Sequence, residues 1–499
     1  MIALDSSGNP VQIGRSVLST PGLEGNARSL DPTSGNLRAE EDATAALQDA
    51  LEAHGVQPQE TIEIVGAFET PSGGMGMRST SAGEPAMVLE VPSPGTGLGQ
   101  MVLVQDESGV VTWSFSEERA AEAGVTRGGG TRTYVIRRHV PPSASPGETR
   151  GLLGAVGRKL LKVLVFPLID PIIERGAATL AEQWERQHRP YRWRTFAPGD
   201  FRDPAGTPVG NDHWAKLAEG PALVLLHGTF SRAHAAFGGM PPDLVRALDD
   251  RYQGRVVAFD HFTLSHDPVR NVAALIAAIP DGTRLDLDLV SHSRGGLVAR
   301  VLAEQPPLDA LGRREVRVGR IVFVATPNAG TVLADPKRMG ELVDRVTTLL
   351  NLFPDNGVTD VLEAVITVVK QLAVGALSGL DGIAAMRPDG AFLTERLNTG
   401  GAGATKYFAL ASNYEPTAPG LLTFARDAAM DRVFGKAEND LVVPSLGVHE
   451  ANGSGCFPIA EVERFGPGDG VHHSGFFAAP RAGERLLEWL RHDDGAAPQ

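Results

Sequence analysis

The residues best placed to do chemistry gather around one serine. An apolar run ends at Val290, the letters SHSRG follow at 291–295, and Gly296 opens a helical pattern. A serine at the apex of a strand, turn and helix is the arrangement of a nucleophile elbow, which needs small neighbours because the turn is strained and the helix packs closely on the strand. Ser291 replaces the first glycine of the usual G-x-S-x-G pattern, one small residue for another. The pattern predicts that Ser293 is a nucleophile, with a phosphate-binding βα turn as the alternative.

A serine hydroxyl becomes a good nucleophile when an imidazole takes its proton and a carboxylate orients that imidazole. In the chain order serine, acid, histidine, both partners follow Ser293. The string ENDLVVP places Asp440 before an apolar run, and DGVHHSGFF places His473 before a terminal helix. We predict Asp440 as the acid and His473 as the base, with Asp469 and His472 as competitors. The histidine pair lacks a third metal ligand at a recognisable spacing, so we predict no metal and no other cofactor.

Acyl transfer also needs N–H donors where negative charge develops on the carbonyl oxygen. We expect one from the backbone of Arg294, the residue after the nucleophile, and one from the backbone of Thr229. Thr229 belongs to an HGTF loop that follows the apolar run ALVLL. The residues expected to support the site are His227, Gly228, Ser291 and Gly295, with His227 as a packed structural histidine rather than a base.

The elements that must position these residues form a repeating pattern. From residue 222 onward, apolar runs alternate with helical patterns, which is typical of a parallel sheet covered on both faces. Strands are expected at 222–228, 255–261, 285–293, 320–327 and 406–412. Residues 332–398 are predicted to be mostly helical, with a broad apolar face at 361–377. Such a face either forms a lid over an acyl pocket or simply packs on the core.

The N-terminal part has a different pattern. We expect an irregular segment at 1–38, a short helix at 40–54, and a small all-β module between 61 and 140 that contains a hairpin turn at 106–109. A linker at 141–151 and a helical segment at 152–187 follow. The basic amphipathic start of that segment either packs between domains or lies on a membrane surface. The predicted units are 1–60, 61–140, 141–220 and 221–492.

Length, charge and cysteine count limit the number of domains, the kinds of partner and the location that we expect. The chain has 499 residues, and 46 Lys+Arg against 60 Asp+Glu give a net charge of −14. Such a length predicts more than one domain, and an acidic chain without a basic block makes nucleic acid an unsuitable partner. A single cysteine, Cys456, excludes an intrachain disulfide. The N-terminus lacks the pattern of a secretory signal and no apolar run is long enough to span a membrane, so we expect a cytoplasmic protein.

Taken together, these motifs resemble the α/β-hydrolase superfamily, specifically its lipase-like branch, over residues 221–490. The strings that carry the resemblance are HGTFS, SHSRGGLVAR, ATPNAGT, NDLVVP and VHHSGFF. Together with AFDHFTLSHDPVRN they are similar to a bacterial group of lipase-like hydrolases, some of which are linked to CHAT-protease and other bacterial conflict modules.

The resemblance implies an α/β-hydrolase fold with a mostly parallel central sheet and a helical lid. From the N-terminal strand patterns we expect a small β-rich module beside it. The resemblance also implies a serine esterase that cleaves lipid or other apolar acyl esters. Contact with a membrane surface stays open through the basic amphipathic start of the segment at 152–187. The alternative is an inactive hydrolase scaffold that binds a protein partner or a membrane, because a fold alone does not determine function. The N-terminal module lies outside the resemblance, and the sequence identifies no partner for it.

Overall fold

The structure is a computed structural model of the chain. It describes residues 1–32, 41–69, 87–106, 109–116, 130–136, 157–168, 178–354, 357–375, 379–400, 403–416, 433–434, 437–451 and 457–491. The predicted linker at 141–151 and Cys456 lie outside these ranges.

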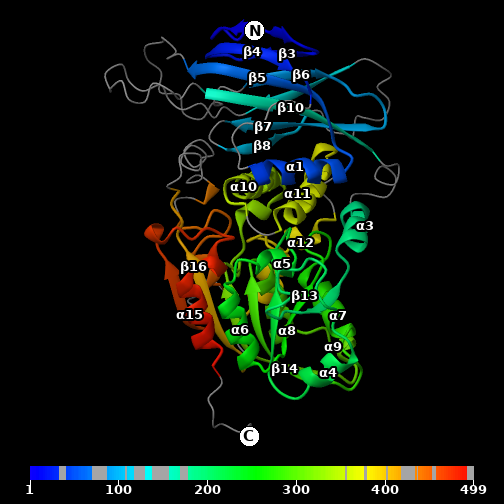
Figure 1. Ribbon diagram of the computed structural model, residues 1–499, viewed down its shortest axis with the longest axis vertical. Coiled ribbons are helices and arrows are strands. Elements are labelled where there is room, and N and C mark those ends of the chain that lie inside the picture. Colours follow the sequence, from blue (N-terminus) through cyan, green and yellow to red (C-terminus); the bar gives the residue numbers. More distant parts are fainter. Residues whose placement is uncertain are drawn as a thin grey trace.

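The C-terminal part is built on a seven-stranded sheet (Figure 1). In spatial order its strands are β11 (Arg192–Thr195), β13 (Val256–Asp260), β12 (Ala222–Leu226), β14 (Arg284–His292), β15 (Glu315–Val324), β16 (Lys406–Ser412) and β17 (Ile459–Phe465). All neighbours are parallel except β11, which runs antiparallel to β13. The five strands predicted from residue 222 onward are confirmed. The short edge strand β11 was not predicted, because four residues carry too little periodicity.

Helices cover both faces of this sheet, because side chains alternate between the faces along each strand. Leu223 and Val290 pack in one apolar cluster, whereas Val224 and Leu289 pack in another on the opposite face. The first cluster is covered by α6 (Pro242–Arg251) and α15 (Pro480–Trp489), and the second by α7 (Pro268–Ala277) and α8 (Gly295–Glu304). Shorter helices are α4 (Asn211–Leu217), α5 (Ala233–Ala236) and α9 (Leu308–Leu311).

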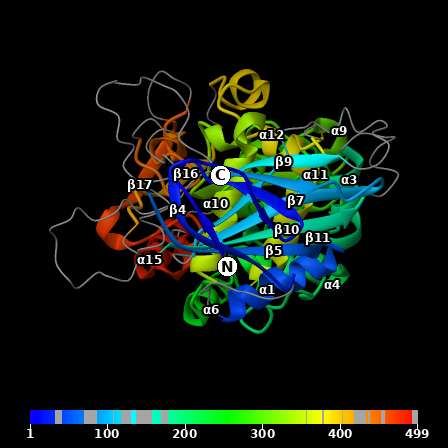
Figure 2. The ribbon, with the colours of Figure 1, turned by 90° about the horizontal axis from the view of Figure 1, so that it is seen from above.

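The segment between β15 and β16 is largely helical, as expected. Its helices are α10 (Met339–Leu352), α11 (Val358–Ala373) and α12 (Asp381–Ala384), with a π-helical turn at Phe392–Leu397. We refer to α10 and α11 as the cap helices. Figure 1 places them between the seven-stranded sheet and the N-terminal strands, and Figure 2 shows those strands lying across them.

The N-terminal strands form two antiparallel sheets, which together with one helix make up what we call the N-terminal β-module. The six-stranded sheet runs β1 (Ile2–Leu4), β4 (Leu23–Leu30), β5 (Gln57–Glu69), β10 (Gly157–Pro167), β7 (Leu98–Asp106), β8 (Val111–Ser114). The second runs β2 (Val11–Ile13), β3 (Ser16–Ser19), β6 (Met87–Pro92), β9 (Thr131–Ile136). Leu18 and Leu89 of the second sheet share an apolar cluster with Ile62 and Leu161 of the first. The helix α1 (Glu41–Ala53) confirms the helix predicted at 40–54.

Two predictions for this part are wrong. Of the segment predicted to be irregular at 1–38, the described residues 1–32 contain the strands β1 to β4, whose short runs alternate too briefly to stand out from their turns. The helical prediction for 152–187 fails at 157–167, which is the central strand β10 between β5 and β7. Leu161 packs in one apolar cluster and Phe166 in the other, so β10 is buried on both faces. The sequence of such a strand is a continuous apolar run, and its periodicity cannot be distinguished from that of a buried helix.

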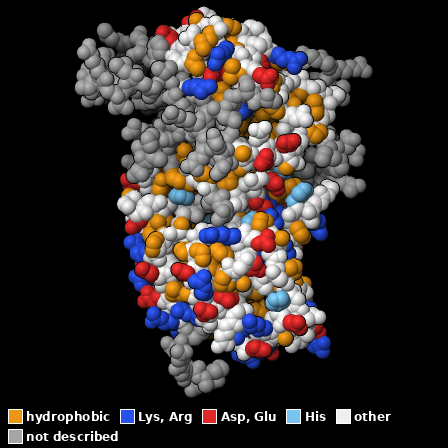
Figure 3. Space-filling view, in the orientation of Figure 1, with side chains coloured by type: hydrophobic (Ala, Val, Ile, Leu, Met, Phe, Trp, Pro, Cys, Tyr) orange, Lys and Arg blue, Asp and Glu red, His pale blue; other side chains and the backbone are white. Residues whose placement is uncertain are grey.

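The same finding removes the membrane-surface interpretation of 157–167. Lys159 is 1% exposed, and Arg158 forms an ion pair with Glu63 of the neighbouring strand. The predicted boundary at residue 141 therefore divides a sheet that continues to residue 167. The later part of the predicted helical segment is confirmed as α3 (Ala178–His188). No helix within the described ranges is long and apolar enough to cross a membrane. On the face drawn in Figure 3, acidic and basic side chains are interspersed over the lower part of the molecule.

Candidate active site

Ser293 occupies a strained turn between β14 and α8. Its φ of 52° lies in the left-handed region, which a residue with a side chain rarely adopts and which is enriched at functional sites. The Ser293 N–H donates to the carbonyl of Val324 over 2.8 Å. A Cβ on Gly295 would lie 2.3 Å from the carbonyl oxygen of Leu226, so the backbone of α8 can approach the sheet only with glycine there. The strand-turn-helix arrangement expected from the sequence is therefore present.

The small residues around the turn have distinct contacts. Ser291 is buried, and its hydroxyl donates to the Val322 carbonyl over 3.2 Å, so a serine fits where the motif usually has glycine. A Cβ on Gly228 would lie 2.7 Å from the Cβ of Ser293. The loop after β12 thus approaches the serine side chain directly.

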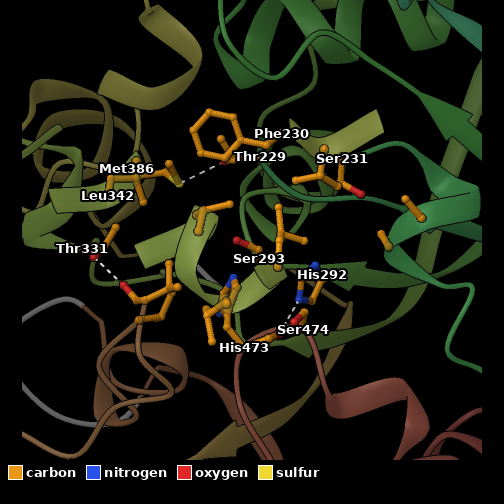
Figure 4. Close-up of a pocket in the computed structure, with 18 residues that line it drawn as sticks. Thr229, Phe230, Ser231, His292, Ser293, Thr331, Leu342, Met386, His473 and Ser474 are labelled. Atoms are coloured by element: carbon orange, nitrogen blue, oxygen red, sulfur yellow. Dashed lines mark hydrogen bonds between the residues drawn. The ribbon is translucent and has the colours of Figure 1, made fainter. Parts of the chain in front are cut away.

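A histidine and a carboxylate meet beside this serine. Nδ1 of His473 lies 2.8 Å from Oδ2 of Asp440, and the His473 N–H donates to the Asp440 carbonyl over 3.0 Å. The other carboxylate oxygen accepts the N–H groups of Val442 and Val443 at 3.0 and 2.7 Å. With Nδ1 donating to the carboxylate, Nε2 is the ring nitrogen that can accept a proton. Ser293 and His473 line one pocket, and Figure 4 shows the serine side chain beside the histidine ring.

The two competing residues have other contacts. The ring of His472 stacks on Phe353 with 4.5 Å between centroids, and its Nδ1 lies 3.1 Å from the hydroxyl of Ser474. Burial, with the neighbouring His473, lowers the pKa of His472 to about 4. Asp469 is on the surface, where its carboxylate accepts the Gly466 N–H over 2.7 Å. The sequence offered two candidate acids and two candidate histidines. The structure brings Asp440 and His473 into contact.

Of the two expected oxyanion donors, Thr229 lines the same pocket, and Arg294 directly follows Ser293 in the chain. The backbone N–H groups of Thr229 and Arg294 make no hydrogen bond with any described residue, so both can serve a ligand. The loop that carries Thr229 is held by Arg189, which donates to the Phe230 carbonyl over 2.7 Å. His227 is fully buried below the loop, and its Nε2 accepts the His261 N–H over 3.0 Å.

Burial lowers the pKa of His227 to about 4, so this ring is neutral near pH 7. Its contacts are those of a packed structural residue, as its sequence context suggested.

The pocket is mainly apolar and has a volume of about 100 Å³. The cap helices supply much of its wall, through Leu342, Val346, Leu349, Leu350 and Val361. An engineered apolar cavity of about 150 Å³ holds benzene, so the space suits a small organic group. No group of three or more His, Cys, Asp or Glu side chains that could hold a metal ion occurs among the described residues.

Three buried side chains connect this site to its surroundings, and sequence reasoning missed all of them. His292 contacts the backbone of His473, with 2.9 Å between its Nε2 and the carbonyl oxygen. The Arg294 side chain, fully buried, donates to the Gly382 carbonyl of α12 over 2.6 Å. Arg345 of α10 donates to the backbone beside Asp440. In the sequence, each of these residues stands out only as a polar side chain within a largely apolar stretch.

The order of the strands, the helices on both faces and the strained turn at Ser293 define an α/β-hydrolase fold. Residues 188–491 match the model of a family described as a domain of unknown function (DUF7379), and the chain belongs to that family. No curated protein matches the chain.

Several solved structures are similar to about half of the chain. They include lipase BlEst2 of Bacillus licheniformis in its mature form, at 19% identity and a TM-score of 0.33, covering 54% of this chain and 91% of that one. EstA from Clostridium botulinum has 12% identity, a TM-score of 0.39, and coverage of 54% and 86%. Lipase 1 from Pelosinus fermentans has 12% identity, a TM-score of 0.37, and coverage of 54% and 99%.

Proposed function

We propose that this protein is a serine hydrolase that cleaves carboxylic esters with an apolar acyl group. The observation that carries the proposal is the 2.8 Å contact between His473 and Asp440 beside Ser293, which stands on a strained elbow in an apolar pocket. A nucleophile, a base and an orienting carboxylate are the three groups that acyl transfer through a serine needs.

In the proposed reaction, His473 takes the Ser293 hydroxyl proton as the oxygen attacks the ester carbonyl. The N–H groups of Thr229 and Arg294 stabilise the tetrahedral oxyanion. His473 then gives its proton to the leaving alcohol, and an acyl-serine remains. Water, deprotonated by His473, then attacks the acyl-serine. As the second tetrahedral intermediate collapses, His473 returns the proton to the Ser293 oxygen and the carboxylic acid leaves. Asp440 keeps the proton on Nδ1 and stabilises the imidazolium that forms in both steps.

The proposed acyl group is short to medium in length. The pocket wall contains five apolar side chains of the cap helices, and the pocket volume suits a small group. We further propose that these helices act as a lid for longer chains. The start of α11 is fastened by Asp360, which accepts hydrogen bonds from Arg232 at 2.6 and 3.0 Å, so longer chains require this contact to loosen.

The test is hydrolysis of p-nitrophenyl esters of increasing acyl length by the wild type, Ser293→Ala and Ser474→Ala. Ser474 also lines the pocket and is a matched control. We expect turnover that is greatest for short acyl chains, is lost in Ser293→Ala and is retained in Ser474→Ala. A folded wild type without turnover on any ester, with or without detergent or lipid vesicles, would favour the inactive scaffold.

A further inference from the structure

The turn that carries Asp440 is strained. Leu441 has a φ of 87°, a conformation that is costly for a bulky residue and persists only where surrounding contacts hold it. Within the turn, Oδ1 of Asp440 accepts two backbone N–H groups, so the direction of the carboxylate depends on the turn geometry. Anything that holds Leu441 therefore also sets the position of the oxygen that faces His473.

The N–H of Leu441 donates to Oδ1 of Asn439 within the turn, whereas its carbonyl is held by a cap helix. Arg345 of α10 donates from Nη1 to the Leu441 carbonyl over 2.8 Å, and its guanidinium lies 5.1 Å from the ring centroid of Phe434. Arg345 is 2% exposed. Burial lowers its pKa to about 10, which still leaves it charged near neutral pH. A buried charge is costly unless it is hydrogen bonded, so the Leu441 carbonyl is a strongly preferred partner.

The other side of α10 is bound to the N-terminal β-module. The strand β8 is the edge of the six-stranded sheet, and an edge strand has backbone groups without strand partners. The Thr348 hydroxyl accepts the Val111 N–H over 3.1 Å and donates to the Val111 carbonyl over 2.8 Å. Asp344 accepts the Trp113 N–H over 2.7 Å, and Thr347 accepts from the Trp113 indole over 3.0 Å. Side chains of α10 thus form hydrogen bonds with backbone groups on the edge strand β8.

We propose that Arg345 is a positioning residue for Asp440, and that the N-terminal β-module fixes Arg345 by docking helix α10 through β8. The module is then a structural part of the active site rather than an independent attachment. This inference rests on the proposed function of Ser293, His473 and Asp440. It assigns a role in the reaction to β8 (Val111–Ser114), which lies more than 200 positions before Asp440 in the sequence.

The first test compares Arg345→Met and Arg345→Lys with Arg338→Met, a partly exposed arginine just before α10. A misplacement of about 1 Å in an active site can cost up to about 100-fold in rate. We expect Arg345→Met to lower kcat by about 10- to 100-fold with little change in KM. Arg345→Lys should recover part of the loss, and Arg338→Met should behave as wild type.

The second test concerns the β-module. Thr348→Val removes both hydrogen bonds to Val111 and keeps the shape of the side chain. We expect a smaller fall in kcat than in Arg345→Met, again with little change in KM. If both residues act through one contact chain, Thr348→Val adds little to Arg345→Met in the double variant. An additive double variant, or Thr348→Val with wild-type kinetics, would overturn the role of the module.

A third measurement does not need a substrate. We expect the Nδ1 proton of His473, which is hydrogen bonded to Asp440, to give a low-field NMR resonance in the wild type and in Arg338→Met. The resonance should be weakened or lost in Arg345→Met and Thr348→Val. An unchanged resonance in folded Arg345→Met and Arg345→Lys would overturn the proposal. This result is distinct from failure of the proposed function, in which the resonance follows the expected pattern but no ester is cleaved.

Discussion

The residue before the nucleophile, His292, donates a hydrogen bond from Nε2 to the main-chain carbonyl of His473, 181 residues further along the chain, over 2.9 Å. The bond joins the serine turn to the loop of the base. Because Nε2 carries the proton of the neutral ring, Nδ1 is unprotonated, and it is buried without a hydrogen-bond partner among the described residues. Burial, reinforced by the neighbouring His473, lowers the pKa of His292 to about 3.

This pKa predicts how stability depends on pH. The folded-state pKa of about 3 is below the ordinary value of 6.5, so the stabilisation by neutral His292 is fully present above pH 6.5 and is lost as the pH falls toward 3. His292→Gln keeps a donor but removes the titrating group. It should reduce the change in the free energy of unfolding between pH 7 and pH 5 by up to about 1.4 kcal/mol per pH unit. Urea unfolding at both pH values measures this change, and equal pH dependence in the two proteins would contradict the prediction.

Asp440→Asn should lower kcat by about 10³- to 10⁴-fold, because an amide no longer keeps the proton on Nδ1 of His473. The fold should persist, since the amide oxygen can still accept the N–H groups of Val442 and Val443. Steady-state kinetics and circular dichroism check both parts. Asp469→Asn is the matched control and should retain wild-type kcat. Full activity in Asp440→Asn would move the acid role to another residue.

Gly295→Ala should destabilise the protein by about 1–3 kcal/mol, because the new methyl group would lie 2.3 Å from the Leu226 carbonyl oxygen and force the backbone apart. Gly468→Ala is the control, since no atom lies within 4 Å of a Cβ added there. Thermal unfolding of both variants measures the difference. Equal unfolding temperatures would mean that α8 does not pack as closely on the sheet as described.

Asp360→Asn should loosen the start of α11. Although burial opposes ionisation, Arg189 and Arg232 hold the pKa of Asp360 below its ordinary value, so the carboxylate is charged near pH 7. Removing that charge leaves Arg189 and Arg232 without their ionised partner, and breaking a buried pair costs about 3–5 kcal/mol. We expect lower stability and a higher ratio of octanoate to butyrate turnover. The exposed Asp389→Asn should change neither quantity, and an unchanged ratio in Asp360→Asn would reject the lid.

Local patterns predicted the parts of the site that depend on local structure. The turn at Ser293 and the strands around it follow from residues within one strand-turn-helix unit, and the order serine, acid, histidine indicated Asp440 and His473. Contacts such as Arg345 to Leu441 could not be predicted, because they depend on how distant segments approach each other. The strand β10 was missed for a related reason, since burial on both faces removes the alternation that identifies a strand.

The assignment of Ser293 as the nucleophile can be tested by measuring the intact mass of the protein after reaction with a fluorophosphonate, followed by peptide mapping. We predict one phosphonyl adduct in the wild type, located on Ser293, and no adduct in folded Ser293→Ala. An adduct that persists in Ser293→Ala, or a folded wild type that gains no mass, would contradict the claim.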